Sequence, residues 1–207
     1  MNHQFTGSEF WNERYQNSDY MYGVQANDFL RAQAHHIKEG GAVLNVAEGE
    51  GRNAVYMAKQ GYRVRGVDFS AEGQRKAMEL AAQHEVQIEY DLADLTRYNM
   101  GEAQWDAVVS IFCHLQASER SELYSSVVKA LKPGGLFIQE VYNKKQLEYG
   151  TGGPGDASYL GSLGQLRKAF EGFEILLAQD IVREIHEGEH HSGTSAVTQF
   201  VARKPAA

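Results

Sequence analysis

The feature of this chain that most restricts its fold is the stretch 43–54, where a short apolar run leads into two closely spaced glycines. Gly49 and Gly51 lack a Cβ atom, so the backbone can turn sharply there and a ligand can lie against it. A second apolar run, 62–67, ends in Asp68. A strand, a Gly-x-Gly turn, a helix and a second strand that ends in a carboxylate are typical of a site for an adenosine-containing cofactor. We therefore expect Asp68 to accept hydrogen bonds from a ribose diol.

Two cofactors fit this spacing. Residues 49–54 satisfy the G-x-G-x-x-A pattern of dinucleotide sites, and Asp68 follows where a ribose-binding acid is expected. The turn also carries Glu48 and Glu50. Their negative charges are unfavourable beside a pyrophosphate but favourable beside the sulfonium and ammonium groups of S-adenosylmethionine. The charges favour S-adenosylmethionine, and a nicotinamide dinucleotide stays open as the alternative.

Beyond this turn, apolar runs rich in Val and Ile alternate with stretches of helical periodicity, which predicts a parallel, doubly wound α/β sheet. Strands are expected near 42–46, 62–67, 86–90, 106–111 and 135–142, and helices near 27–38, 52–60, 70–83 and 118–131. Ser70 and Ser118 are candidate N-caps, and the Pro-Gly-Gly at 133–135 is expected to stop the last of these helices. Two extended segments, 173–185 and 194–202, are joined by a glycine-containing turn and are expected to pair as an antiparallel hairpin.

Five segments occur in the order found in class I S-adenosylmethionine-dependent methyltransferases, which the chain resembles: 44–52, 67–70, 91–95, 105–110 and 131–135. Three more are similar to the tellurite-resistance and thiopurine-methyltransferase branch: 10–15, 51–54 and 150–154. The likeness spans nearly all of the chain. It implies one domain over 1–207, a Rossmann-like sheet of five parallel strands closed by a C-terminal hairpin, with 1–38 as a helical lid.

Ligands of such sheets bind at the carboxyl ends of the strands. The expected cofactor-binding residues are Tyr22, Ala47, Glu48, Gly49, Gly51, Asn53, Asp68, Phe69, Asp91, Leu92, Ser110 and Ile111. The resemblance assigns the ribose hydroxyls to Asp68 and the adenine amino group to Asp91, with Asp94 as a rival. The chain departs from most relatives at Asn45, where they carry an acid, and at Ala47, where they carry glycine.

The N-terminal segment is rich in aromatic residues, namely Phe10, Trp11, Tyr15, Tyr20 and Tyr22. It is either an amphipathic segment that covers a sheet edge or a lid that closes over the sulfonium, excludes water and offers cation–π contact. Arg14 is a candidate partner for a cofactor carboxylate or for a structural acid. Later in the chain, the glycine-rich run 150–156 lacks the Lys-Ser/Thr of a phosphate loop and is interpreted as a mobile flap on the substrate side.

Two histidines are candidate catalytic residues. His114 follows the fourth expected strand, and His186 lies in a Glu-Ile-His element that resembles one with a functional histidine in tellurite-resistance methyltransferases. A structural role is the alternative for both. Residues 186–190 also match H-E-x-x-H, but that zinc chemistry needs a helix, and Gly188 and the flanking β-rich segments favour a turn. No metal site is expected.

Composition restricts the partners. The net charge of −7 and the scattered basic residues argue against nucleic-acid binding. No apolar run approaches the roughly 18 residues of a membrane span, and the N-terminus lacks the pattern of a signal peptide. Cys113 is the one cysteine, so no intramolecular disulfide is possible and a cytoplasmic setting is expected.

These observations predict an S-adenosylmethionine-dependent methyltransferase that acts on a small acceptor by in-line displacement at the methyl carbon. A soft nucleophile, such as a thiol or a tellurium or selenium species, needs no strong base, whereas a hydroxyl or amine needs one. Two alternatives remain: an NAD(P)-linked oxidoreductase and a non-catalytic S-adenosylmethionine-binding protein.

Overall fold

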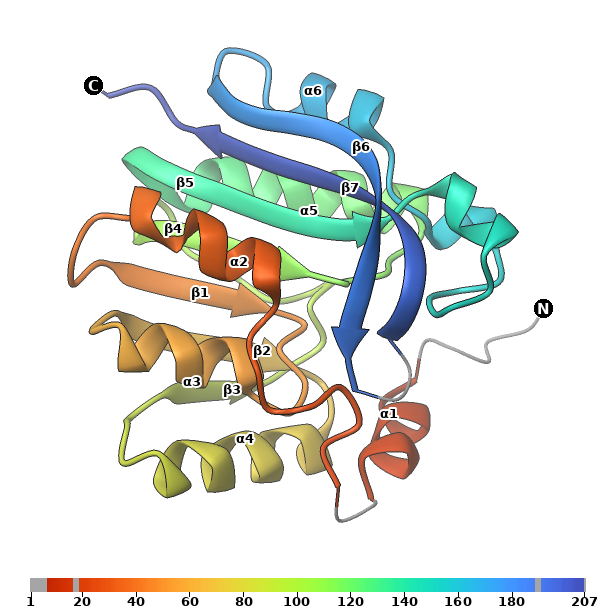
Figure 1. Ribbon diagram of the computed structural model, residues 1–207. Coiled ribbons are helices and arrows are strands. Elements are labelled where there is room, and N and C mark those ends of the chain that lie inside the picture. Colours follow the sequence, from red (N-terminus) through yellow and green to blue (C-terminus); the bar gives the residue numbers. More distant parts are fainter. Residues whose placement is uncertain (1–6, 17–18, 189–190, 207) are drawn as a thin grey trace.

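The computed structural model describes residues 7–16, 19–188 and 191–206, which include one seven-stranded sheet with helices on both faces (Figure 1). The strand order is β3-β2-β1-β4-β5-β7-β6. Strands β1 to β5 pair in parallel, and β7 pairs antiparallel with both β5 and β6. The expected parallel sheet closed by a C-terminal hairpin is therefore confirmed. The strands are β1 (Ala42–Val46), β2 (Arg63–Asp68), β3 (Glu89–Leu92), β4 (Trp105–Ile111), β5 (Leu131–Tyr142), β6 (Glu174–Glu187) and β7 (His191–Arg203).

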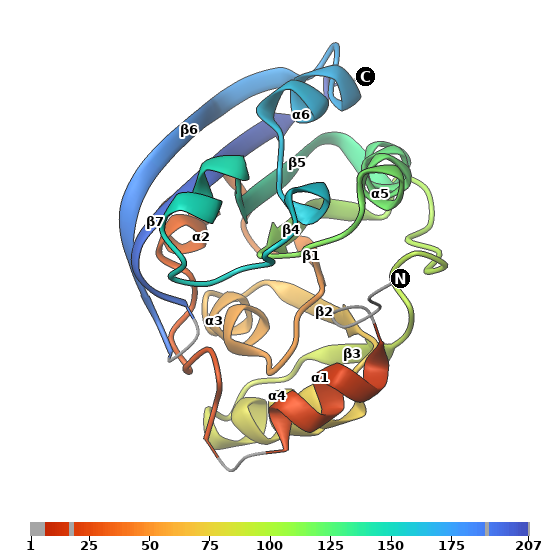
Figure 2. The same ribbon diagram turned by 90° about the vertical axis from the view of Figure 1, so that its right-hand side faces the viewer.

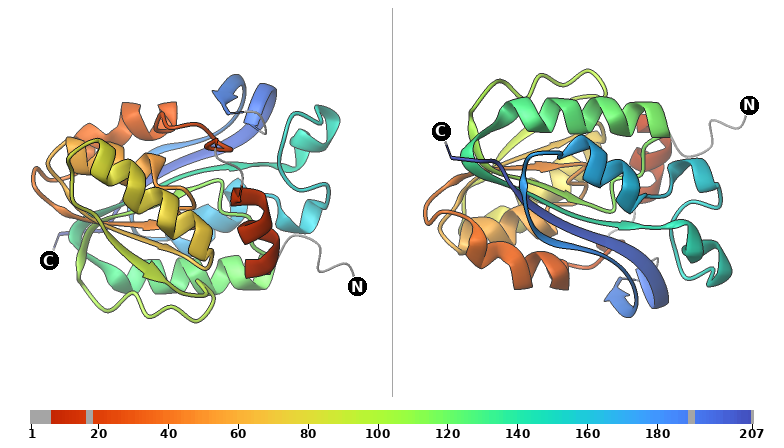
Figure 3. Two further views of the ribbon diagram at one scale, coloured as in Figure 1. Left: turned by 90° about the horizontal axis from the view of Figure 1, so that it is seen from below. Right: turned by 90° about the horizontal axis from the view of Figure 1, so that it is seen from above.

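Helices cover the two faces of the sheet in separate groups (Figures 2 and 3). Apolar side chains of α2, α3 and α4 pack against strand residues such as Val43, Ala107 and Val109. Helices α5 and α6 pack against the intervening residues, such as Leu44 and Val108, because successive strand side chains point to opposite faces. The helices are α1 (Ser8–Tyr15), α2 (Asp28–Gln33), α3 (Arg52–Lys59), α4 (Ala71–Gln83), α5 (Ala117–Ala130) and α6 (Leu163–Ala169). Among the described residues, no helix is long and apolar enough to span a membrane.

Helix α1 lies beside the N-terminal end of α4, apart from the two groups that cover the sheet (Figure 1). The side-chain oxygen of Asn12 accepts hydrogen bonds from the Ser70 hydroxyl (2.8 Å) and from the backbone N–H of Glu72 (3.2 Å). Ser70 is also the predicted N-cap of α4, because its hydroxyl accepts a bond from the Gly73 N–H at 3.0 Å. The N-terminal segment is thus attached at the point where the chain leaves β2.

Several boundaries differ from the sequence prediction. Helix α5 is capped by Gln116 and not by Ser118, because Gln116 and Glu119 bond each other's backbone in a capping box. The helix ends at Ala130, and the expected stop at 133–135 lies inside β5, whose pairing with β4 is irregular there.

Two other elements are displaced along the chain. The strand expected over 86–90 is Glu89–Leu92, so Asp91 and Leu92 lie within the strand and not after it. The helix expected over 27–38 is shorter: α2 is followed by a 3-10 turn, Ala34–His36. Both differences arise where a short element has few residues to define its ends.

The two glycines of the turn have different structural constraints. Gly49 has φ +60°, and an added Cβ would lie 2.8 Å from the Tyr15 hydroxyl. Gly51 has φ +90°, and an added Cβ would lie 2.6 Å from Cα of Ala77 in α4. Gly51 therefore permits both the left-handed turn and the close contact between the start of α3 and α4.

We expect Gly51→Ala to destabilise the fold more than Gly61→Ala. Both glycines have nearly the same φ, +90° and +87°, but nothing lies within 4 Å of a Cβ at Gly61. The strain of a left-handed alanine, about 1–2 kcal/mol, is common to both variants. Only Gly51→Ala adds overpacking, about 1–3 kcal/mol more. Urea unfolding measures the two free energies, and an equal loss in both variants would contradict this packing argument.

Candidate functional site

A cavity of about 370 Å³ opens at the carboxyl ends of the strands. Its walls come from the glycine turn, the ends of β2 and β4, the loop after β3, α1 and the loop that follows it, the glycine-rich loop after β5, and the start of β7. Segments far apart in the sequence thus meet at this edge of the sheet, as expected for a doubly wound fold.

The structure brings together most, but not all, of the residues that the sequence singled out. The lining includes Tyr22, Ala47, Glu48, Gly49, Asn53, Asp68, Phe69, Ile111 and His114. The lining does not include Gly51, Asp91, Leu92, Ser110 and His186. Ser110 is buried within β4, and Gly51 lies behind the turn, where it contacts α4.

Asp68, the last residue of β2, is 7% exposed and faces the glycine turn. Its carboxylate accepts hydrogen bonds from the N–H groups of Gly49 (3.1 Å) and Ser70 (2.9 Å). Burial raises the pKa of Asp68, and these two bonds oppose that shift. Each carboxylate oxygen keeps a second lone pair. The carboxylate is therefore both part of the turn and able to accept further bonds from a ligand.

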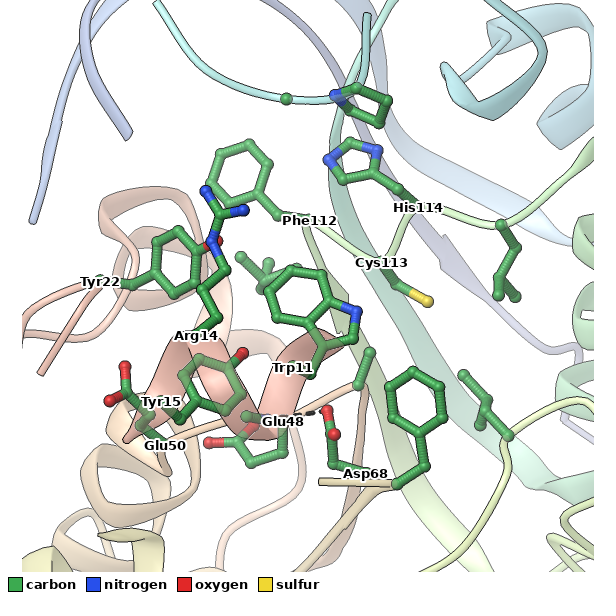
Figure 4. A pocket seen from close by; sticks show the side chains of 18 of the residues that line it. Trp11, Arg14, Tyr15, Tyr22, Glu48, Glu50, Asp68, Phe112, Cys113 and His114 are labelled. Carbon is green, nitrogen blue, oxygen red and sulfur yellow. Dashed lines mark hydrogen bonds between the residues drawn. The ribbon is translucent and has the colours of Figure 1, made fainter. Parts of the chain in front are cut away.

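Two further acids line the same wall of the cavity (Figure 4). Burial raises the pKa of Glu48 to about 7, although its carboxylate accepts a bond from the Ala54 N–H at 2.7 Å. Glu50 pairs with the buried ammonium group of Lys76 at 2.7 Å. The second oxygen of Glu50 is buried and has no hydrogen-bond partner among the described residues. This wall suits a cation and is unfavourable for a phosphate.

The loop after β3 presents different residues from those expected. Asp91 accepts a bond from the Tyr98 hydroxyl (2.6 Å) and lies 3.6 Å from Arg65, outside the cavity. Leu92 is 51% exposed. Asp94 and the two residues after it line the cavity instead. The rival acid thus has the position that the sequence assigned to Asp91, because β3 ends later than predicted.

Aromatic residues of the N-terminal segment also line the cavity, and Tyr15 among them lies beside the glycine turn. The Trp11 ring lies 5.5 Å from that of Tyr15 and 6.4 Å from that of Tyr22. The guanidinium group of Arg14 lies 5.3 Å from the Phe10 ring centre, and its Nε donates to the Met21 sulfur at 3.1 Å. The segment thus presents rings and one cation to the cavity.

Two further aromatic side chains line the cavity: Phe112, which directly follows β4, and His191, which begins β7. Phe112 has φ +52°, which is rare for a bulky residue, and its N–H donates to the Glu140 carbonyl at 2.8 Å. Its ring lies 6.4 Å from His114 and 4.4 Å from His191. His191 was not among the residues that the sequence singled out. Its position in the cavity depends on the pairing of β7 with β6, which the sequence alone does not determine.

The ionisable groups at the end of β4 are neutral near pH 7. Burial lowers the pKa of His114 to about 4, and the nearby backbone of Tyr159 opposes this shift only in part. Burial raises the pKa of the Cys113 thiol to about 12. His114 is thus a weak proton acceptor, and Cys113 is not a thiolate.

His186 lies on the exposed face of β6, paired with Ser192. The H-E-x-x-H stretch extends beyond the described residues at 189–190, but His186 and Glu187 belong to a strand and not to a helix. The described part of the chain contains no group of three or more His, Cys, Asp or Glu residues that could hold a metal ion.

A buried network of charges connects the glycine turn with the C-terminal hairpin. Arg52, the first residue of α3, pairs with Glu187 at 2.6 Å, and Arg183 pairs with Glu140 at 2.6 Å. Asn27 joins the two pairs by donating to Glu140 (2.7 Å) and Glu187 (2.8 Å). Two arginines balance two glutamates, so the network satisfies its own charges.

Comparison with known proteins agrees with this geometry. Residues 43–135 match the family model of a methyltransferase domain. Phosphoethanolamine N-methyltransferase 2 of Caenorhabditis elegans is 30% identical over 110 residues, or 52% of this chain and 25% of that protein. A putative methyltransferase of Geobacillus is 31% identical over 112 residues, or 52% of this chain and 44% of that protein. The chain thus spans less than half the length of these curated relatives.

Solved structures share the fold at low identity. One described as "Conversion of a Disulfide Bond into a Thioacetal Group during Echinomycin Biosynthesis" has TM-score 0.77 at 17% identity, covering 96% of this chain and 93% of that chain. TehB from Haemophilus influenzae has TM-score 0.71 at 19% identity, covering 95% and 66%. A Haemonchus contortus phosphoethanolamine N-methyltransferase 2, in complex with phosphomonomethylethanolamine and S-adenosylhomocysteine, has TM-score 0.68 at 19% identity, covering 98% and 58%.

Residues 43–135 are thus similar to a methyltransferase domain, and the fold is the Rossmann-like α/β fold of the solved methyltransferases. The Haemonchus structure contains S-adenosylhomocysteine, and the acidic wall of the present cavity suits a cationic ligand. The TehB structure is the link to the tellurite-resistance branch that the sequence resembles. These likenesses do not single out the thiopurine-methyltransferase branch.

We expect the His114 imidazole to stay neutral from pH 8 down to about pH 5.5, since burial lowers its pKa from 6.5 to about 4. Between these two values the unfolded chain binds more protons than the folded one. This histidine therefore contributes stability that is present above pH 6.5 and is lost as the pH falls toward 4. Histidine NMR resonances, assigned with His114→Asn, measure the midpoint. A midpoint near 6.5 would contradict the buried position.

Proposed function

We propose that this chain is an S-adenosylmethionine-dependent methyltransferase whose acceptor is a small, soft nucleophile such as a thiol or a selenium or tellurium species. The observation that carries the proposal is the position of Asp68. It ends β2, lines the cavity and bonds the glycine turn, so that ribose hydroxyls can approach its free lone pairs.

The charges of the cavity fit this cofactor better than a dinucleotide. Glu48, Glu50 and Asp68 share one wall, and one oxygen of Glu50 is buried without a partner among the described residues. Lys76 pairs with the other oxygen of Glu50. An ammonium or sulfonium group would compensate the charge of the acids that remains, whereas a pyrophosphate would add to it. The charge argument therefore supports methyl transfer over hydride transfer.

The proposed work of the chain's own residues is binding, alignment and exclusion of water. When bound, S-adenosylmethionine supplies an electrophilic methyl group on sulfur. Asp68 accepts bonds from the ribose, Phe69 lies beside the adenine, and Asp94 is now the stronger candidate than Asp91 for the adenine edge. The aromatic lid closes the opening, and alignment in a dry site accelerates an in-line displacement.

The acceptor end favours a nucleophile that needs no strong base. His114 has a pKa of about 4, too low for it to remove a proton from a hydroxyl or an ammonium group. A thiolate or a reduced selenium or tellurium species is already nucleophilic. Two structural neighbours are compatible with such an acceptor: the protein that converts a disulfide bond into a thioacetal group in echinomycin biosynthesis, and TehB. The phosphoethanolamine methyltransferases make an amine the second candidate.

Other roles stay as separate hypotheses. His186 was predicted to be catalytic, and its exposed position on β6 makes it a weaker candidate than His114. A non-catalytic S-adenosylmethionine-binding protein needs the same acidic wall but no acceptor site. An acceptor-dependent reaction therefore distinguishes the enzyme from the binding protein.

We expect the purified, cofactor-stripped protein to be stabilised by S-adenosylmethionine and S-adenosylhomocysteine but not by NAD. A ligand that binds only the folded state raises the free energy of unfolding, by about 2.7 kcal/mol at a concentration 100 times Kd. The melting temperature rises as a result. We further expect formation of S-adenosylhomocysteine when a thiol or selenide is added. Calorimetry and a coupled assay for S-adenosylhomocysteine measure the two properties.

Matched variants test the roles of the acids. Asp68→Ala is expected to weaken S-adenosylhomocysteine binding by about 2–4 kcal/mol, since charge-assisted bonds inside the cavity are lost. Asp94→Asn is expected to weaken it more than Asp91→Asn, which alters a contact outside the cavity. A protein stabilised by NAD alone would overturn the proposal, and binding without turnover of any acceptor would favour the non-catalytic alternative.

A further inference from the structure

Buried charges connect the end of β6 to the segment that follows the glycine turn. Glu187 is the last residue of β6, and its side chain is 5% exposed. Its carboxylate pairs with Arg52 at 2.6 Å and accepts a bond from Asn27 at 2.8 Å. Arg52 directly follows the glycine turn. The end of β6 is therefore tied to the segment that forms the cofactor site.

Gly188, the residue after Glu187, makes a second close contact, with the loop at Tyr22 and Gly23. Gly188 has φ +70°, and an added Cβ would lie 2.6 Å from Cα of Tyr22. A Cβ at Gly23 would in turn lie 3.6 Å from the Gly188 nitrogen. Backbone thus packs directly on backbone, with no room for a side chain between the hairpin and the loop. The backbone of Gly188 and the backbone of the loop at Tyr22 and Gly23 are therefore in direct contact.

These two contacts bring His191 into the cavity. His191 begins β7 and pairs with Glu187 in the hairpin register. It is 7% exposed, it lines the cavity, and its ring lies 4.4 Å from the rings of both Tyr22 and Phe112. His186, five residues earlier, is exposed and lies outside the lining. The hairpin therefore directs one histidine inward and the other outward.

The side of the cavity that His191 lines is the side away from the acids. Figure 4 shows Glu48 and Asp68 on one side and Phe112 and His114 on the other. Under the proposed function, the acidic wall binds the cofactor, which leaves the wall of aromatic rings to the acceptor. Since His191 packs against Phe112, its ring belongs to the acceptor wall.

We propose that His191 is a catalytic residue that contacts the methyl acceptor, and that Glu187 is the positioning residue that holds it there. The assignment rests on the proposed function and names a histidine that neither the sequence motifs nor the resemblance identified. The imidazole orients the nucleophilic atom of the acceptor by hydrogen bonding, while Tyr22 and Phe112 fix the plane of the ring. Glu187 and His191, the residues that end β6 and begin β7, thus belong to the proposed active site.

The test uses histidine-labelled wild-type protein and two probes, S-adenosylhomocysteine and sinefungin. In sinefungin an amine-bearing carbon replaces the methyl-bearing sulfur of S-adenosylmethionine, so its amino group lies where the methyl group points toward the acceptor. We expect the imidazole resonances of His191 to shift more with sinefungin than with S-adenosylhomocysteine, and those of His186 to stay unchanged. The resonances are assigned with His191→Gln and His186→Gln. The primary measurement is on the wild-type protein and does not depend on how well a variant folds.

The positioning role of Glu187 has its own matched pair. At saturating concentrations of both ligands, Glu187→Gln is expected to abolish the difference between the His191 responses to sinefungin and to S-adenosylhomocysteine, so that a change in cofactor affinity does not enter the comparison. Glu184→Gln, on the exposed face of the same strand, is expected to change neither. With any acceptor that the wild type methylates, His191→Gln is expected to lower kcat/KM by about tenfold or more at unchanged cofactor affinity.

The outcomes separate this assignment from the proposed function. If sinefungin stabilises the protein but the His191 resonances do not move, or those of His186 move instead, the assignment is wrong and the proposed function stands. If neither probe binds, the proposed function is wrong, and the assignment falls with it.

Discussion

The hydrogen bond from the Gly49 N–H to the Asp68 carboxylate, 3.1 Å long, is the contact on which the site depends. It joins the turn after β1 to the end of β2, two strands whose parallel register already brings Val46 beside Val67. The other carboxylate oxygen accepts from Ser70, whose hydroxyl donates to Asn12 of the N-terminal helix. A single carboxylate therefore links the turn, the start of α4 and helix α1. A ligand at Asp68 would contact the centre of this network.

Electrostatics divides the cavity into two parts with different chemistry. The acids of the turn are buried. Burial raises the pKa of Glu48 to about 7, and Glu50 pairs with Lys76. The other part of the cavity is lined by aromatic rings, the neutral His114 and Arg14. Behind both walls, the paired charges of Arg52 and Glu187 are satisfied within the protein. This distribution of charge is the basis of the proposal that the cofactor binds beside the acids and the acceptor beside the rings.

The sequence predicted the parts of the fold that local patterns determine. The apolar runs located the strands, the serine at position 70 was recognised as a cap, and Asp68 was placed at the end of β2. The failures have physical causes. Strand β3 has four residues, too few for periodicity to define its end, and Asp94 lines the cavity whereas Asp91 does not. His191 reaches the cavity through strand pairing and long-range ion pairs, and Phe112 through a strained backbone, neither of which a local pattern reveals.

The most direct test of the account is a crystal structure of the protein with S-adenosylhomocysteine bound. The account predicts that the ribose hydroxyls lie within hydrogen-bonding distance of the Asp68 carboxylate, and that the cofactor sulfur faces the wall formed by Phe112 and His191. Binding away from the end of β2, or a bound cofactor whose sulfur points away from those two rings, would contradict it.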